Sequence, residues 1–263
     1  NTPPRCVAPL DPPATDPTHI GWARRRPLDH DDMEPTVSDK PLLPAVADHW
    51  DGRADTFDDE PDHGLRDPAT RAAWAERLTA WLPEPPATVA DLGCGTGSLS
   101  VLLAEAGHDV VGVDLSSTMV EHARIKGEGT SARFVVGDAG DPPLAPASVD
   151  VVLVRHVVWT LPDPHAALRR WMELLRPGGR LVMVEGRWGQ PDAPADPDAD
   201  HGDYTPIHAR LPWYGGVTPA VLTEALAPLV ADVEVHDLAG DERLWGHAVH
   251  DIRFAVVARI ATT

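Results

Sequence analysis

The chain has 263 residues, 43 % of them hydrophobic, which suits one large α/β domain or two small ones. Its 41 acidic residues outnumber its 22 basic residues, and the formal net charge is -19 at pH 7. A nucleic-acid ligand needs basic surface that releases counterions, so this charge argues against a DNA- or RNA-binding protein. No apolar run is long enough to cross a membrane and no signal-peptide pattern is present, so we expect a cytoplasmic protein without membrane contact.

The N-terminal stretch differs in composition from the rest of the chain. Residues 1–46 hold ten prolines and few large apolar residues, which is typical of an extended arm or a partly disordered leader. We therefore take 1–46 as an arm and 47–263 as the folded domain. The two cysteines, Cys6 and Cys94, are far apart and form no Cys-x-x-Cys pair, so we expect neither a disulfide framework nor a bound metal.

Helix and strand patterns alternate along the folded domain. A first helix begins at Asp67 and Pro68, which suit a helix start, and ends at Pro83. The later patterns predict helices at 98–106, 116–125, 163–175 and 218–229, and strands at 88–92, 109–113, 133–136, 149–154, 180–185, 233–236 and 253–260. This βαβ rhythm predicts an α/β fold with a doubly wound, Rossmann-like sheet that has helices on both faces.

A glycine-rich turn follows the first predicted strand, in the stretch "VADLGCGTGSLS". The nicotinamide fingerprint G-x-G-x-x-G would place its third glycine at position 98, but Ser98 stands there. The glycines are instead Gly93, Gly95 and Gly97, and Asp91 precedes them by two residues. The resulting D-x-G-x-G-x-G pattern resembles the first motif of class I S-adenosylmethionine-dependent methyltransferases.

Three further features follow in the order that this family shows. Asp114 ends the second strand, where a carboxylate accepts both ribose hydroxyl protons, although its distance of 21 residues from Gly93 also fits a dinucleotide site. Asp138 follows the third strand, and in the family an acid there binds the adenine amino group. The stretch "LLRPGGRLVMVE" resembles the segment that leads into the fifth strand. The resemblance covers most of 47–260 and implies a seven-stranded sheet whose last strand is antiparallel.

The resemblance also implies a cofactor site for S-adenosylmethionine, with S-adenosylhomocysteine as product. The stretch around "WDGRADTFDD" is similar to a family segment that folds over the methionine end of the cofactor, where Arg53 pairs with the carboxylate. The alternative is that Trp50 and Phe57 are ordinary core residues. The implied cofactor residues are Trp50, Arg53, Phe57, Asp91, Gly93, Cys94, Gly95, Gly97, Asp114, Leu115, Met119, Asp138, Ala139 and Arg155.

Acceptor residues are expected in two stretches beyond the strand ends. In "RHVVWTLPDP", His156 is a candidate general base because an imidazole titrates near neutrality, and Trp159 is placed to stack on a flat acceptor. A structural histidine is the alternative. The cap elements are expected at 47–83 and 187–218. The second cap element contains the stretch "DYTPIHARLPWYGG", which is rich in aromatic and histidine residues. These residues either contact the acceptor or form a packed lid without direct contact. They are Tyr204, His208, Trp213 and Tyr214.

These observations favour a methyltransferase that acts on an oxygen or nitrogen of a small molecule in natural-product biosynthesis, by direct displacement. The same fold also suits a cofactor-assisted cyclase or decarboxylase, or a non-catalytic protein that retains the cofactor. The expected partners are a small-molecule acceptor and, as a possibility, a second copy of the chain in a homodimer.

Overall fold

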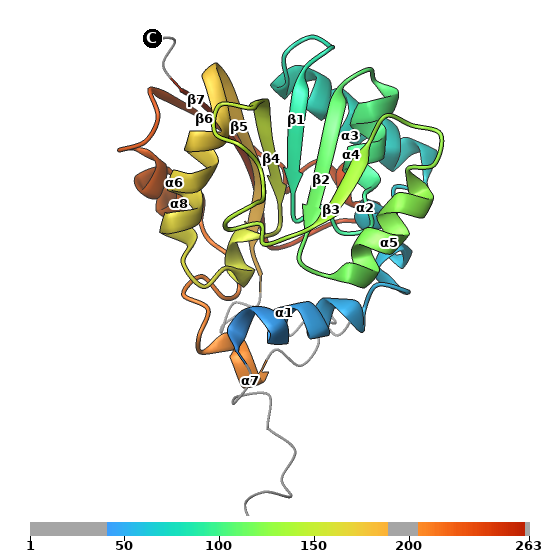
Figure 1. Cartoon of the computed structure of the whole chain (residues 1–263), viewed down its shortest axis with the longest axis horizontal. Helices are drawn as coiled ribbons and strands as arrows, with labels where there is room; N and C mark the ends of the chain where they lie inside the picture. The colour runs from blue at the N-terminus through green and yellow to red at the C-terminus, as the bar shows by residue number, and fades with distance from the viewer. Residues whose placement is uncertain (1–40, 189–204, 261–263) are drawn as a thin grey trace, which may run out of the picture. The chain divides into compact units, whose positions relative to one another are not determined.

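The computed structural model describes residues 41–188 and 205–260, and Figure 1 shows how their helices and strands are arranged. The proline-rich arm up to residue 40 and Tyr204 of the expected acceptor group lie outside these residues. Helix α1 (Leu42–Asp51) begins inside the stretch that we assigned to the arm. Pro44 does not prevent this, because a proline in the first helical turn removes no intrahelical hydrogen bond.

The described strands form one mixed sheet with the order β3-β2-β1-β4-β5-β7-β6. Strand β7 runs antiparallel to both of its neighbours, β5 and β6, while the pairs among β1 to β5 are parallel. The seven-stranded sheet with an antiparallel last strand is therefore confirmed. The strands are β1 (Thr88–Leu92), β2 (Asp109–Asp114), β3 (Arg133–Val136), β4 (Val149–Arg155), β5 (Leu175–Arg187), β6 (Asp232–Asp237) and β7 (Ile252–Arg259).

Among the described residues, four of the five long helices that follow α1 begin at a capping side chain, and the other begins at Gly97 without one. Asp67 accepts a hydrogen bond from the main-chain N–H of Thr70, and Ser116 accepts one from Met119. These helices are α3 (Pro68–Trp81), α4 (Ser98–Glu105), α5 (Ser117–Lys126), α6 (Pro164–Leu174) and α8 (Pro219–Leu226). Within the described ranges, no helix combines the length and the apolar character needed to span a bilayer.

Five short helical segments were not predicted, because three or four residues are too few to show a periodic pattern. They are η3 (Phe57–Asp59), α2 (Pro61–Gly64), η4 (Val158–Thr160), α7 (Thr205–His208) and α9 (Glu242–Trp245).

The sheet is buried on both faces, as its apolar strands predict. Along β4, Val151 and Leu153 pack in the cluster that includes α3 and α4, while Val152 and Val154 pack in the cluster that includes α6 and α8. Figure 1 shows these two helix layers on opposite sides of the sheet, and α1 lying across the end to which the parallel strands point. In open α/β sheets ligands bind at that end.

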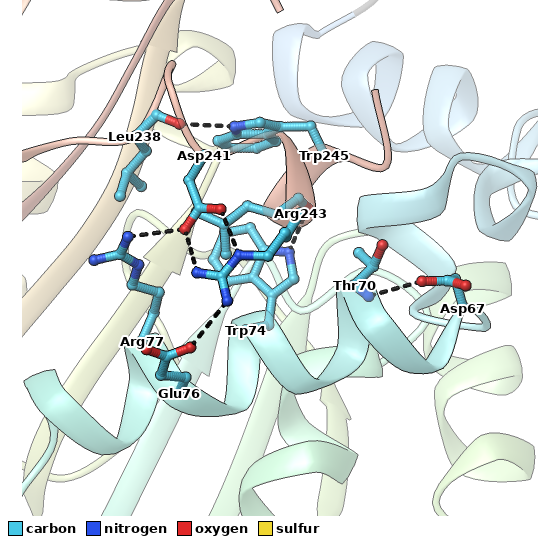
Figure 2. A network of polar contacts seen from close by, with 10 residues as sticks. Asp67, Thr70, Trp74, Glu76, Arg77, Leu238, Asp241, Arg243 and Trp245 are labelled. Atoms are coloured by element: carbon cyan, nitrogen blue, oxygen red, sulfur yellow. Dashed lines mark hydrogen bonds and ion pairs between the residues drawn. The ribbon is translucent and has the colours of Figure 1, made fainter. Parts of the chain in front are cut away.

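A polar network fixes α9 to α3, as Figure 2 shows. The indole of Trp74 donates to the main-chain oxygen of Leu244 at 2.8 Å. The side chain of Asp241 accepts from both Arg243 and Arg77, and these two guanidinium groups lower the pKa of Asp241 to about 2. Trp245, which is 1 % exposed, is thereby held in one place under the candidate site.

Candidate functional site

The glycine turn lies between β1 and α4 at the carboxyl end of the sheet. Gly93, Gly95 and Gly97 have φ values of 73°, 53° and 81°, a region that side chains disfavour. A Cβ atom at Gly93 would lie 2.2 Å from Cγ2 of Val157, so a larger residue does not fit there. The Gly93 N–H donates to the main-chain oxygen of Val113 at 2.7 Å, which ties the turn to β2. The turn therefore has room for main chain alone at Gly93.

Asp114 lies beside this turn at the end of β2. Its Oδ2 accepts from the N–H of Gly95 at 2.8 Å, and its Oδ1 accepts from the N–H of Ser116 at 2.9 Å. Burial raises the pKa of Asp114, although these two hydrogen bonds oppose the rise. Each carboxylate oxygen has lone-pair capacity beyond its one main-chain donor, so the group is fixed in position and still able to accept from two hydroxyl groups.

Three of the expected cofactor residues lie behind the turn. Asp91 is 2 % exposed and accepts from Oγ of Ser100 at 2.6 Å, and burial raises its pKa to about 6. Burial raises the pKa of the Cys94 thiol well above its usual range, so this sulfur is not a thiolate nucleophile. Met119 is 1 % exposed.

The segment η3 closes over the turn from the outside. Asp58 accepts from Oγ1 of Thr96 at 2.5 Å and lies 2.7 Å from Nζ of Lys126. Burial raises the pKa of Asp58, but the contacts with Lys126 and Thr96 outweigh burial and hold it below its usual range. A Cβ atom at Gly95 would lie 3.1 Å from the Phe57 ring, so Phe57 packs closely over the turn at this glycine.

Helix α1 is tied to the same edge. Asp51 accepts from Oγ of Ser116 at 2.5 Å, which joins the end of α1 to the start of α5. The adjacent Trp50 lies with its ring centroid 6.0 Å from Phe57 and 6.1 Å from Trp159. Trp50 therefore connects the cover of the glycine turn to the expected acceptor region.

Arg155 is partly buried at the end of β4 among acidic groups. Its Nη1 donates to the main-chain oxygen of Asp62 at 2.5 Å, and its guanidinium lies 5.2 Å from the Trp74 ring. Burial lowers the pKa of Arg155, and the negative charges of Asp62, Asp91 and Asp58 oppose this shift. The positive charge is therefore balanced within the site.

Aromatic residues from separate segments meet beyond the ends of β4 and β5, and we call them the aromatic wall. Trp159 lies at the centre, with ring centroids at 6.1 Å from Trp50, 6.0 Å from Trp188 and 6.0 Å from Tyr214. His208 extends the wall, 5.2 Å from Tyr214. Trp159 and Trp188 are buried, whereas Tyr214 is 38 % exposed. Trp159 and Trp188 are thus packed inside the wall, and Tyr214 forms its exposed edge.

His156 occupies a sharp turn directly after β4, with φ at 58°. Its ring stacks on Trp245 at 6.0 Å and lies 5.0 Å from Trp188. Its main-chain oxygen accepts from the indole of Trp159 at 2.8 Å, so the same turn fixes the centre of the aromatic wall.

Glu185 holds this turn from β5 and is fully buried. Its Oε1 accepts from the N–H groups of Val157 and Val158 at 3.1 and 3.2 Å. Burial raises the pKa of Glu185 to about 8, and the two main-chain hydrogen bonds only partly oppose this shift. The carboxyl group is therefore largely protonated at neutral pH.

Other expected residues are placed apart from this centre. Trp213 lies 5.3 Å from His165 and packs against the core on the α6 and α8 side, so it does not join Tyr214 in the wall. Asp138 accepts from the N–H of Gly140 at 2.7 Å, and the main-chain oxygen of Ala139 accepts from Trp171. These bonds form the loop after β3.

The two remaining residues expected to contact the cofactor are Leu115 and Arg53. Leu115 is partly buried against the cluster that holds α1 and Trp159. Arg53 is partly buried in the turn after α1, where its N–H donates to the oxygen of Trp50.

Sequence reasoning missed four residues of the site. Glu185 and Trp188 follow the apolar run of β5, and a lone acid at the carboxyl end of a buried strand is a usable signal for the first. Asp62 and His63 lie in a four-residue helix and carry no periodic signal.

Comparison with known proteins shows that the chain is similar to methyltransferases. A family model described as a methyltransferase domain matches residues 90–183. Trans-aconitate 2-methyltransferase of Methylobacterium radiotolerans is 32 % identical over 197 residues, which cover 68 % of this chain and 71 % of that protein. An uncharacterized methyltransferase of Mycobacterium tuberculosis is 40 % identical over 115 residues, 43 % of this chain. The chain spans 46 % of the length of that relative, and 36 % of another.

Among solved structures, geranyl diphosphate C-methyltransferase from Streptomyces coelicolor A3(2) aligns with a TM-score of 0.59 at 18 % identity. The alignment covers 84 % of this chain and 98 % of that one. At this identity the likeness concerns the fold.

Proposed function

Because the chain belongs to the class I S-adenosylmethionine-dependent methyltransferases, we propose that it transfers the methyl group of this cofactor to an oxygen or nitrogen of a small molecule. The observation that carries this proposal is the aromatic wall next to the glycine turn. Methyl transfer needs an acceptor held in line with the S–CH₃ bond and shielded from water. In this proposal the rigid aromatic wall beside the glycine turn holds the acceptor in line and shields it from water.

In this proposal the cofactor lies against the glycine turn. Asp114 accepts hydrogen bonds from the ribose hydroxyl groups, and the loop of Asp138 and Ala139 contacts the adenine. The methionine end lies under Phe57 and Trp50, where Arg53 and Arg155 offer positive charge to its carboxylate. The arrangement is supported by the main-chain hydrogen bonds that fix Asp114 and by the closeness of Phe57 to the turn.

The acceptor is proposed to be a flat, apolar secondary metabolite that stacks on the aromatic wall. The relatives named above are themselves named for small molecules, trans-aconitate and geranyl diphosphate. The net charge of -19 disfavours a nucleic-acid acceptor.

The proposal is tested by measuring S-adenosylhomocysteine by mass spectrometry after incubation with S-adenosylmethionine and a panel of phenols, N-heterocycles, amines and carboxylic acids. We expect acceptor-dependent formation of S-adenosylhomocysteine together with an acceptor heavier by one methyl group. Conversion of a substrate without consumption of S-adenosylmethionine would instead identify a cyclase or decarboxylase. Binding of the cofactor with no product across the panel would favour a non-catalytic protein.

Replacing Tyr214 with alanine is expected to raise the KM for an aromatic acceptor about 2- to 10-fold, because one stacking contact contributes about 0.5–1.5 kcal/mol. Tyr214 is 38 % exposed, so its loss opens no core cavity. Tyr214→Phe keeps the ring and serves as the matched control, with a nearly unchanged KM. Equal KM values for wild type and Tyr214→Ala would place the acceptor away from the wall.

Replacing His156 with alanine is expected to slow turnover about 10²-fold if the acceptor loses its proton to this imidazole. The pH profile is the discriminating measurement, because a base imposes a rise in rate through its own pKa that the variant loses. A variant whose pH profile matches that of the wild type would assign His156 a purely structural role in its turn.

A further inference from the structure

Three side chains that carry metal-binding atoms meet beneath the cover of the glycine turn. Asp62 and His63 come from α2, and His156 comes from the turn after β4. One ligand atom of each lies within 4.8 Å of the other two. Oδ2 of Asp62 and Nε2 of His63 are 3.8 Å apart. The fold thus brings one carboxylate and two imidazoles together from two distant segments.

Polar atoms of this cluster are buried without being satisfied. Asp62 is 6 % exposed, and its Oδ2 has no hydrogen-bond partner among the described residues. The same holds for the buried Nδ1 of His63. A polar atom buried without a partner destabilises a fold, so these atoms are expected to bind a water molecule or an ion.

The surrounding charges suit a cation in spite of the nearby guanidinium of Arg155. That group already donates to the main-chain oxygen of Asp62 and is balanced by Asp62, Asp91 and Asp58. An imidazole binds a metal ion through a deprotonated ring nitrogen, so the site is expected to take up its ion at neutral rather than acidic pH.

We propose that Asp62, His63 and His156 bind one divalent first-row transition-metal cation, such as Zn²⁺ or Co²⁺. Two imidazoles with one carboxylate form a donor set that these ions favour, whereas Mg²⁺ and Ca²⁺ favour oxygen ligands. Bonds of about 2.0–2.2 Å require the three groups to move closer together than they lie here. The side chain of His63 is 26 % exposed, which gives it room to move and gives the ion a path from solvent.

The affinity of the metal site is measurable without S-adenosylmethionine, so its test does not depend on methyl transfer. It also limits the role proposed for His156 above. The ring nitrogen that binds the cation is not available to take a proton. His156 therefore acts as a general base only in the metal-free protein.

The test is a titration of the full, chelator-treated chain with Co²⁺, followed by its visible absorption and by calorimetry. We expect one equivalent to bind with the absorption bands of a nitrogen- and oxygen-ligated ion, and His63→Gln to weaken this binding at least tenfold. His250→Gln removes an exposed histidine and serves as the matched control, with unchanged affinity. Asp62→Asn, which keeps the shape of the side chain, is the second variant if His63→Gln does not fold.

Absence of Co²⁺ binding would overturn the proposal. Equal affinity in wild type, His63→Gln and Asp62→Asn would also overturn it, because the ion would then be bound elsewhere in the chain. Titration of the same samples with S-adenosylmethionine shows separately whether the cofactor site is intact.

Discussion

The Asp114→Ala variant is expected to bind S-adenosylmethionine roughly 10²–10⁴-fold more weakly than the wild type. Two main-chain N–H groups fix the carboxylate, one to each oxygen, so it meets both ribose hydroxyl groups without further ordering. A hydrogen bond to a charged group contributes about 1.5–3 kcal/mol, and two of them account for this loss.

Titration calorimetry below the unfolding temperature measures the effect of Asp114→Ala on the folded protein. Asp109→Asn is the matched control, because Asp109 lies at the opposite end of β2 and pairs on the surface with Arg133 at 3.1 Å. We expect this control to bind like the wild type. An unchanged affinity in Asp114→Ala would remove Asp114 from the cofactor site.

Glu185→Gln is expected to become more stable than the wild type as pH rises from about 5 to about 8. The pKa of Glu185 is about 8 in the folded chain because of burial, against 4.5 for an exposed glutamate. Between these values the unfolded chain has released a proton that the folded chain still holds, so rising pH favours unfolding. Glutamine keeps an oxygen for Val157 and Val158 and does not titrate. The full difference is on the order of 4 kcal/mol.

Urea unfolding of both proteins at several pH values measures this difference in free energy. Glu234→Gln is the control, because Glu234 is an exposed glutamate on β6, paired with Arg259. Its stability relative to the wild type should stay nearly constant with pH. A pH-independent difference for Glu185→Gln would mean that Glu185 is ionised in the folded state.

The sheet was predictable because its strands carry a strong local pattern. The apolar run of β4 is buried on both faces, and only a parallel central strand requires this. The short segments α2 and α9 were not predictable, because tertiary contacts stabilise them rather than their own periodicity. The bond from Trp74 to Leu244 is an example, since it joins residues that are 170 positions apart.

The part of the candidate site that lies at the carboxyl ends of the parallel strands was predictable from the sequence. Asp114 and the glycine turn meet because β1 and β2 are adjacent and parallel. Trp213 and Tyr214 show the limit, since the sequence grouped them but their side chains pack on different clusters. The meeting of His63 with His156 depends on how α2 folds over β4, which no local pattern reports.

The central proposal for this protein is that the glycine turn and Asp114 form a site for S-adenosylmethionine. The most direct test is a thermal-shift titration with S-adenosylmethionine, S-adenosylhomocysteine and NAD side by side, because a ligand of the folded state raises the unfolding temperature as its concentration exceeds Kd. We expect the first two to raise the unfolding temperature and NAD to leave it unchanged. A rise with NAD alone would contradict the assignment of the site.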